Sequence, residues 1–290
     1  IGAFDGVHLG HQAVIRHLLE KSAELAVPSV IIVFEPLPRE YLSPVKAPAR
    51  IMSFREKYFA MKALGVDRLM RIRFNEQLRG RSAQRFIDDS FVAGRGVRYV
   101  VLGDDFRFGN DRQGDLEFIK RQGPRYGYEA GPTPTLLIDD ELVSSTRIRG
   151  ALEKADFAQA ERLLGRPYSI SGKVIYGRQL GQTIGTPTAN LELHRLRAPL
   201  SGVYVVEVRG GGLKNARGVA NVGVRPTVDD SIKANLEVHL LDREIELYGQ
   251  HIEVRFRHKL REEQKFGSVD ELRENIARDI ESTRDWFLRN

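Results

Sequence analysis

The hydrophobic positions in the first half of the chain alternate between two periods. Helical spacing occurs three times, in the residues that follow His11, at 54–64 and at 82–92. Short apolar segments, which are typical of buried parallel strands, lie at 29–34 and 98–102, and 66–72 is predicted to be a further strand after Gly65. This β-α-β-α order predicts a parallel α/β sheet, whose ligands bind at the carboxyl ends of its strands.

The second half has a different pattern, in which short segments rich in β-branched and aromatic residues follow one another without helices between them. These segments are 168–176, 202–208, 218–222, 235–241 and 252–256. They predict a small antiparallel β-barrel. We expect a helix over 151–164 to join the halves and a helix beginning near Val269 to close the chain. The predicted domains are therefore an α/β domain at 1–165 and a barrel domain at 166–290.

Composition narrows the class of protein. The 290 residues include no cysteine, which excludes disulfides and thiolate metal sites. No apolar run reaches the roughly 18 residues of a membrane span, and no secretory signal is seen, so we expect a cytoplasmic protein without a membrane partner. Because the chain opens inside a strand-like segment, we also expect residues before Ile1 to complete that strand.

Charge points to the kind of partner. The formal net charge of +6 favours anions, either nucleic acid or polyphosphate nucleotides. Basic residues are dispersed, with one modest cluster at 255–261 that we interpret as a solvated face. The oligomeric state is not predicted.

A first candidate site lies at the start of the chain, where a strand end, a glycine turn and a helix start meet at the spacing His-x-Gly-His. The residues concerned are Phe4, Asp5, Gly6, His8, Gly10 and His11. A helix N-terminus offers unpaired N–H groups and a partial positive charge, and glycine lets the backbone approach an anion closely. Two histidines three residues apart can also bind a metal or lie on the surface. Because no further metal ligand follows nearby, this context favours phosphate.

Two later segments support the phosphate hypothesis. Gly103, Asp104, Asp105 and Phe106 follow a buried strand, where a ligand loop belongs, although a polar turn with packing aromatics has the same pattern.

The other segment comprises Ser145, Thr146, Arg147 and Arg149, at the entry to the connecting helix. Serine and threonine there can be ordinary N-caps. Two arginines in a first helical turn oppose the helix dipole at about 0.3–1 kcal/mol each, which favours a bound anion beside them.

A second candidate site lies in the predicted barrel. Gly177, Gly181 and Gly185 make a pliable loop without the Gly-Lys-Ser/Thr of a Walker A motif. Thr188 and Asn190 then alternate onto one face of a strand. Their neutral oxygens suit a Mg²⁺ ion that keeps waters and binds phosphate oxygens.

These motifs carry a family resemblance. Phe-Asp-Gly-x-His-x-Gly-His together with Ser-Ser-Thr-Arg-Ile-Arg resembles the nucleotidylyltransferase superfamily. The loop Gly-Asp-Asp-Phe-Arg-Phe-Gly is similar to that of the N-terminal module of bacterial bifunctional riboflavin kinase/FAD synthetases. Pro-Thr-Ala-Asn and the segments 219–227, 236–239 and 260–266 resemble the flavokinase signature. The resemblance covers essentially the whole chain, with the motifs in order.

The resemblance implies a Rossmann-like nucleotidylyltransferase domain that adenylylates FMN to FAD with ATP and releases pyrophosphate. His8 and His11 would contact the ATP phosphates and stabilise charge at the α-phosphorus. The Ser145–Arg149 segment would hold the β- and γ-phosphates, and Asp105 would lie near the flavin phosphate or the reacting centre. The other residues singled out at 4–10 and 103–106 complete the expected substrate site.

For the barrel, the resemblance implies phosphorylation of riboflavin to FMN. Thr188 and Asn190 would coordinate Mg²⁺ and ATP phosphate, Glu237 would be the base for the riboflavin 5′-hydroxyl, and Arg225 would belong to the substrate site. Without the resemblance, Glu237 would be interpreted as an exposed strand residue.

The predicted protein is a bifunctional enzyme of flavin-cofactor synthesis, with small molecules and no nucleic acid as partners. One alternative is a nucleotidylyltransferase for another small phosphate with an inactive barrel, and the other is a nucleic-acid-binding protein. The chain departs from many relatives at Leu37, Gln182, Thr186 and Asp105, so no family role is assigned to Leu37.

Overall fold

The computed structural model describes residues 1–94, 96–103, 106–176, 187–226, 232–243 and 245–290. They form two compact units. The first comprises Ile1–Pro48 and Phe54–Ser144, and the second comprises Ala49–Ser53 and Ser145–Asn290. Residues 145–165, which we predicted to belong to the first domain, lie in the second unit by their contacts. Where the two catalytic domains divide stays a prediction.

The first unit contains the predicted parallel strands. β1 (Val30–Glu35) pairs in parallel with β2 (Arg68–Arg73), and β3 (Tyr99–Leu102) pairs in parallel with β4 (Glu129–Pro132). The start of the chain touches both pairs: Gly2 N donates to Ile32 O at 3.1 Å, and the amino group of Ile1 donates to Val101 O at 3.4 Å. The loop that follows residue 2 is thereby anchored to the sheet.

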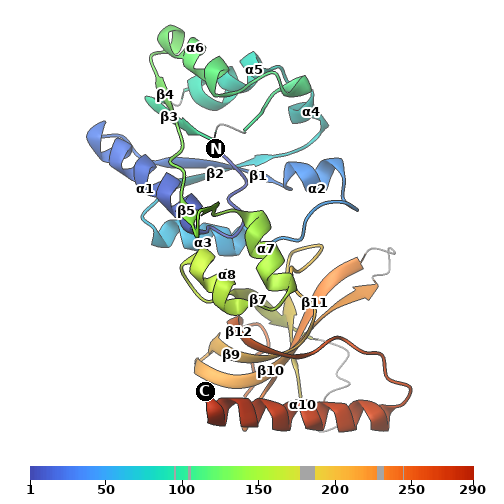
Figure 1. Ribbon diagram of the computed structural model, residues 1–290. Coiled ribbons are helices and arrows are strands. Elements are labelled where there is room, and N and C mark those ends of the chain that lie inside the picture. The colour runs from blue at the N-terminus through green and yellow to red at the C-terminus, as the bar shows by residue number, and fades with distance from the viewer. Residues whose placement is uncertain (95, 104–105, 177–186, 227–231, 244) are drawn as a thin grey trace. The chain divides into compact units, whose positions relative to one another are not determined.

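Helices cover both sides of these strands. In Figure 1, α3 (Phe54–Ala63) lies on one side of the β1–β2 pair and α5 (Ala83–Ile87) on the other. The helix predicted over 82–92 is α5 followed by a π-helical turn at Asp88–Val92. The remaining elements of the unit are α1 (Leu9–Glu24), α2 (Pro38–Leu42), α4 (Glu76–Arg79), a 3-10 turn at Asn110–Arg112, α6 (Leu116–Tyr126) and the hairpin β5 (Leu137–Ile138) and β6 (Glu141–Leu142).

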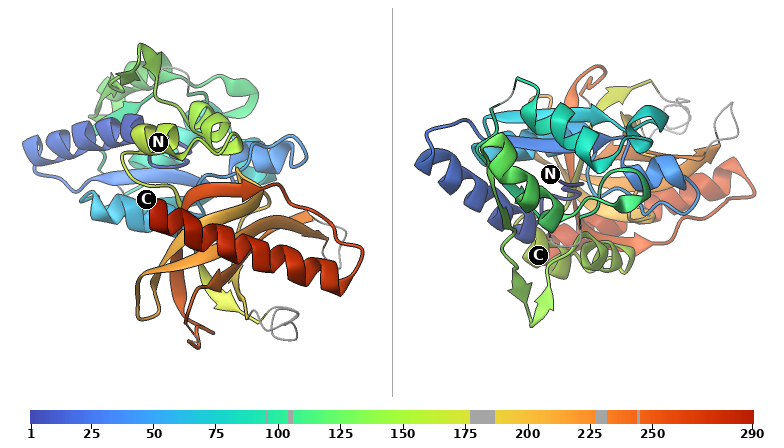
Figure 2. Two further views of the ribbon diagram at one scale, coloured as in Figure 1. Left: turned by 60° about the horizontal axis from the view of Figure 1, so that its bottom comes forward. Right: turned by 90° about the horizontal axis from the view of Figure 1, so that it is seen from above.

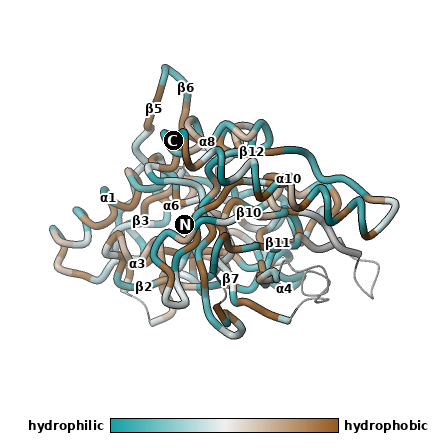
Figure 3. Tube along the Cα trace, turned by 90° about the horizontal axis from the view of Figure 1, so that it is seen from below, coloured by the Kyte–Doolittle hydropathy of each residue, from teal (hydrophilic) through white to brown (hydrophobic). Residues whose placement is uncertain are grey.

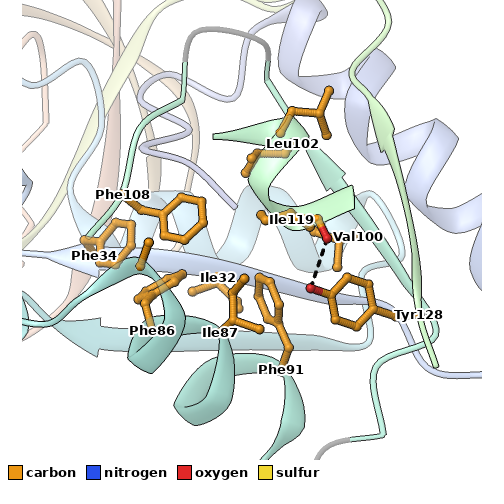
Figure 4. Packing of buried hydrophobic residues seen from close by; sticks show 12 residues of the cluster. Ile32, Phe34, Phe86, Ile87, Phe91, Val100, Leu102, Phe108, Ile119 and Tyr128 are labelled. Atoms are coloured by element: carbon orange, nitrogen blue, oxygen red, sulfur yellow. Dashed lines mark hydrogen bonds between the residues drawn. The ribbon is translucent and has the colours of Figure 1, made fainter. Parts of the chain in front are cut away.

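An aromatic core fills one side of this unit. Phe86 is at its centre and packs against Phe34 from β1, Phe91 and Phe108, and Tyr128 packs in turn on Phe91 (Figure 4). The Tyr128 hydroxyl donates to the main-chain oxygen of Ile119 at 3.2 Å, and burial raises the pKa of Tyr128 to about 12. This packing fixes β1, to which Gly2 is hydrogen-bonded, and β3, which Gly103 follows.

The single connecting helix predicted over 151–164 is wrong, because the segment folds as two helices. α7 (Ser145–Glu153) ends before Ala155, which is left-handed with φ 54°. α8 (Phe157–Leu164) starts anew, since the Asp156 carboxylate accepts a hydrogen bond from Gln159 N at 2.9 Å. An aspartate cap in the middle of an apolar pattern thus interrupts the helix.

The second unit confirms the predicted barrel. Six antiparallel strands close in the order β10-β11-β8-β7-β12-β9. Their bounds are Ser169–Ile175 (β7), Ala189–Glu192 (β8), Gly202–Gly210 (β9), Leu213–Pro226 (β10), Ile232–Leu240 (β11) and His251–Arg261 (β12).

The predicted closing helix is α10 (Val269–Arg289), which packs on β9, β10 and β12 (Figure 2). Figure 3 shows polar and apolar residues alternating along it. The Arg261 guanidinium binds the Asp279 carboxylate in bidentate fashion, with N–O distances of 2.9 and 2.7 Å, and so joins β12 to α10. Within the described residues, no helix combines the length and apolarity needed to cross a membrane.

Candidate functional site

The first candidate site is the loop that leads into α1. His8 is the N-cap of α1, and its Nδ1 accepts a hydrogen bond from the main-chain N–H of His11 at 3.3 Å. The two imidazoles stack, with ring centroids 3.6 Å apart and planes 20° from parallel. Because the Nδ1 of His8 is an acceptor, its Nε2 carries the proton of the neutral ring and can donate. The pair presents ring nitrogens beside a helix N-terminus, where an anion is stabilised.

The backbone before His8 has an unusual conformation. Phe4, Gly6 and Val7 have φ angles of 47°, 90° and 41°, in the left-handed region that glycine tolerates and a β-branched residue ordinarily avoids. The loop is held by hydrogen bonds from Val7 N to Phe4 O at 3.3 Å and from the Gln12 amide to Val7 O at 3.0 Å. Asp5 is buried within it. Such strained turns concentrate at functional sites, because the surrounding structure must hold them in place.

The His11 ring is desolvated by burial and has His8 and Lys57 as neighbours. Burial, followed by the neighbouring His8 and Lys57, lowers the pKa of His11 well below its ordinary value of 6.5. Its buried Nδ1 has no hydrogen-bond partner within the described residues. A neutral imidazole with an unsatisfied nitrogen is poised for a polar ligand, and an anion beside it would raise its pKa again.

Gly10 links this loop to the end of the first unit. A Cβ on Gly10 would lie 3.1 Å from the His8 Nδ1 and 3.1 Å from the main-chain oxygen of Val143. A side chain there would therefore press on the histidine. α7 begins at Ser145, two residues after Val143, and its first turn contains no acidic residue. Along that turn Thr146 is exposed, whereas Arg147 and Arg149 are half-buried.

The structure describes half of the other predicted ligand loop. Phe106 N donates a hydrogen bond to Gly103 O at 3.0 Å, just after β3. The Phe106 ring stacks on Phe34 and Phe108, with centroids 6.4 and 6.1 Å apart. Phe106 therefore packs against the core, which was one of the two interpretations of this loop. Asp104 and Asp105 lie outside the described residues.

The second candidate site is a row of polar residues across three adjacent strands of the barrel. Glu237 on β11 is directly opposite Asn221 on β10 and directly opposite Asn190 on β8. Opposed residues of antiparallel strands share a face, so these three side chains are neighbours. Asn190 is buried, and one carboxylate oxygen of Glu237 accepts a hydrogen bond from the Asn235 amide at 2.9 Å.

Other predicted residues of the barrel site are described in part. Thr188 is half-buried, immediately before β8, and Pro187 O lies 2.9 Å from a ring nitrogen of His239 on β11. Gly177, Gly181 and Gly185 lie outside the described residues, and the same holds for the side chain of Arg225. Within the described chain, no three His, Asp or Glu side chains form a metal-binding group.

The basic cluster at 255–261 is largely neutralised by carboxylates, which fits its interpretation as a solvated face. Arg255 pairs with Glu253 at 3.1 Å, Arg257 with Glu207 at 2.7 Å, and Lys259 with Glu262 at 2.6 Å. Arg261 is engaged by Asp279. Three of these pairs are partly exposed, so each contributes little to stability while it cancels positive charge.

Two residues that bear on the sites were not predicted. Lys57 on α3 is fully buried, and its Nζ donates to Ala3 O at 2.5 Å, next to the loop before His8. Nothing in the helical pattern of 54–64 distinguishes this lysine from a surface residue. Asn221 lies within a segment that carried the flavokinase resemblance, but its pairing with Glu237 depends on strand register.

Comparisons with known proteins agree for both units. A family model described as FAD synthetase matches residues 1–147, and one described as riboflavin kinase matches residues 164–287. The bifunctional riboflavin kinase/FMN adenylyltransferase of Pseudomonas fluorescens is 48% identical over 284 residues, covering 98% of this chain and 91% of that protein. The Escherichia coli (strain K12) protein of the same name is 46% identical over 287 residues, covering 99% and 91%.

A solved structure is similar over the same length. A crystal structure from Streptococcus pneumoniae, described as a macrolide-efflux protein, has a TM-score of 0.75 and 32% identity, covering 99% of this chain and 93% of that one. The description concerns that protein, and the likeness shows that its chain shares this fold from end to end.

Proposed function

Because the chain belongs to the family of bifunctional riboflavin kinase/FMN adenylyltransferases, it converts riboflavin to FMN and FMN to FAD, and we propose which of its residues carry the two reactions. The assignment rests on one observation: each unit contains one cluster of polar side chains whose chemistry suits one of the two reactions. The stacked His8 and His11 lie in the first unit, and Glu237 lies beside Asn190 in the second.

In FAD formation, a phosphate oxygen of FMN attacks the α-phosphorus of ATP. The bond from that phosphorus to the bridging oxygen breaks, and pyrophosphate leaves with the electron pair. We assign His8 and His11 to the α-phosphate, where the N–H groups of two imidazoles at a helix N-terminus stabilise the developing charge. Because an adjacent anion raises the pKa of His11, the field of the phosphates itself turns this ring into a better donor.

The leaving pyrophosphate is assigned to the start of α7. Ser145 and Thr146 supply hydroxyl and main-chain donors, and Arg147 and Arg149 supply charge that the first turn does not otherwise compensate. Phe4, Asp5, Gly6, Gly103, Asp104, Asp105 and Phe106 complete the proposed substrate site.

In FMN formation, the riboflavin 5′-oxygen attacks the γ-phosphorus of a second ATP and ADP leaves. Glu237 takes the proton of the hydroxyl, and the hydrogen bond from Asn235 orients its carboxylate. We propose that Gly177, Gly181, Gly185 and Arg225 contact the substrates of this site.

A Mg²⁺ ion fits the remaining donors. The Asn190 side chain is buried next to Glu237 on a face that holds phosphate in this scheme, and Thr188 adds a neutral oxygen two residues away. We propose that these two residues hold Mg²⁺, which when bound neutralises charge on the ATP phosphates. We also propose that the enzyme works on small molecules in the cytoplasm, with neither nucleic acid nor membrane as a partner, which the neutralised basic cluster supports.

Separation of flavins by chromatography tests the assignment. With riboflavin, ATP and Mg²⁺, we expect FMN to accumulate first and FAD to follow. Glu237→Ala should stop FMN formation and leave FAD synthesis from supplied FMN, and His11→Ala should do the reverse. Loss of both activities in either folded variant would refute the two-site assignment.

A further inference from the structure

Asn221 holds a buried acceptor that the assignments above leave unused. Its Oδ1 is shielded from solvent and has no hydrogen-bond partner within the described residues. A buried amide oxygen without a donor is unfavourable, so such atoms in a native protein call for a ligand or water. The position is not incidental, because Asn221 is directly opposite Glu237 in the register of β10 and β11.

In the row of Asn190, Glu237 and Asn221, the residues on the two sides of Glu237 are placed to contact different parts of the substrates. Asn190 on β8 flanks Glu237 on one side, and Asn221 on β10 flanks it on the other. In the proposed function, which this inference rests on, Asn190 faces the phosphate that is transferred. The nucleophilic hydroxyl lies at Glu237, so the rest of the alcohol extends toward the Asn221 side.

The chemistry of the two facing groups selects a polyol. A carboxylate and an amide oxygen are both acceptors, and they cannot satisfy each other. Opposed side chains on antiparallel strands have Cβ atoms about 4.5–5.5 Å apart, so two acceptors at that spacing suit a chain with hydroxyls on successive carbons. The ribityl chain of riboflavin carries such hydroxyls next to the 5′ position.

We propose that Asn221 orients riboflavin for phosphorylation: its Oδ1 accepts a hydrogen bond from a ribityl hydroxyl and thereby holds the 5′-hydroxyl at Glu237. The residue contacts the substrate alcohol and takes no proton in the reaction. The Glu263 carboxylate lies against Gly223, two residues along the same strand from Asn221.

Asn221→Leu tests the proposal, since leucine has similar volume and no acceptor. We expect the KM for riboflavin to rise about tenfold, the equivalent of one hydrogen bond, while the KM for ATP stays within about twofold. Lumiflavin, which has the flavin ring and no ribityl chain, should inhibit the variant and the parent kinase equally. Lys214→Leu, an exposed site on the same strand, is the matched control and should change neither KM.

A second variant guards against a merely structural effect. Asn221→Asp keeps an acceptor and should recover most of the affinity for riboflavin. The thermal midpoint of each variant, followed by circular dichroism, verifies that the barrel is folded.

Three results would overturn the proposal. They are an unchanged KM for riboflavin in folded Asn221→Leu, an equal rise in the KM for ATP, and an equal loss of lumiflavin inhibition, which would place Asn221 at the ring. Glu237→Gln distinguishes failure of the Asn221 proposal from failure of the proposed function. If that variant keeps full kinase activity, the assignment of the base is wrong, whereas the effect of Asn221 on the KM for riboflavin is measured independently in the parent chain.

Discussion

His8 and His11 are held together by a stacking contact and a hydrogen bond. Their rings stack at 3.6 Å, and the main-chain N–H of His11 donates to the Nδ1 of His8 at 3.3 Å. The main-chain N–H of His11 thus sets the tautomer of His8, and the pKa of His11 is lowered by burial first and then by the neighbouring His8 and Lys57. This coupling makes the pair sensitive to small changes in the residues around it.

Gly10→Ala should impair FAD synthesis even though alanine is favoured over glycine in a helix by about 1 kcal/mol. The new methyl group would meet the His8 ring and Val143 O at 3.1 Å, so the ring must move by a few tenths of an ångström. We expect kcat/KM for FMN adenylylation to fall about tenfold, as small misplacement of a catalytic group costs about that much or more. Gly80→Ala, whose methyl group would make an ordinary 3.5 Å contact, is the control. Equal activities of the two variants would contradict the prediction.

The stability of the first unit should depend on pH through His11. Because the pKa of His11 is lowered in the folded state, the unfolded chain binds its proton first as the pH falls. Folding stability from this residue is complete above the ordinary pKa of about 6.5 and declines as the pH drops below it toward the folded value. Amide hydrogen exchange in α1 between about pH 7.5 and pH 5.5 measures this loss. It should be smaller in His11→Gln, and an identical loss in both proteins would refute the prediction.

Lys57→Met should weaken the loop before His8. The substitution removes the Nζ donor that lies 2.5 Å from the main-chain oxygen of Ala3, and a hydrogen bond from a charged group contributes about 1.5–3 kcal/mol. We expect lower protection of α3 amides and a fall in FAD synthesis, with FMN formation as an internal reference. Lys62→Met removes an exposed lysine from the same helix and should leave both activities unchanged. A Lys57→Met variant that makes FAD at the parent rate would show that the loop does not need this lysine.

Asp279→Asn should destabilise the barrel unit by about 2 kcal/mol, because it removes the charge from a largely buried bidentate pair with Arg261. Trp286, the one tryptophan of the chain, stacks on His258 at 6.2 Å, so its fluorescence follows unfolding of this unit in urea. Asp285→Asn breaks an exposed pair with Arg289 at 3.7 Å and should change stability by much less. Coincident transitions of the two variants would contradict the prediction.

The spacing of apolar residues predicted most helices and strands, because the buried face of each element recurs in the sequence with the period of that element. The runs that became β1 and β3 are apolar since both faces of those strands are covered, and the barrel strands follow at short intervals. The pattern failed at 151–164, where the apolar spacing continues through Asp156 although its side chain caps a new helix. Whether a helix begins at a given residue can depend on one capping side chain, and the spacing of apolar residues does not reveal such a cap.

The sequence by itself determined the two kinds of domain, the His-x-Gly-His junction and the family, because these depend on neighbouring residues or on motifs in order. Only the tertiary structure decided which distant groups meet. Strand register set Asn221 and Asn190 on either side of Glu237, and packing of α3 brought the Lys57 ammonium to Ala3. The lowered pKa of His11 has the same origin, since desolvation and the charges of neighbours depend on atoms that the fold brings together across many residues of chain.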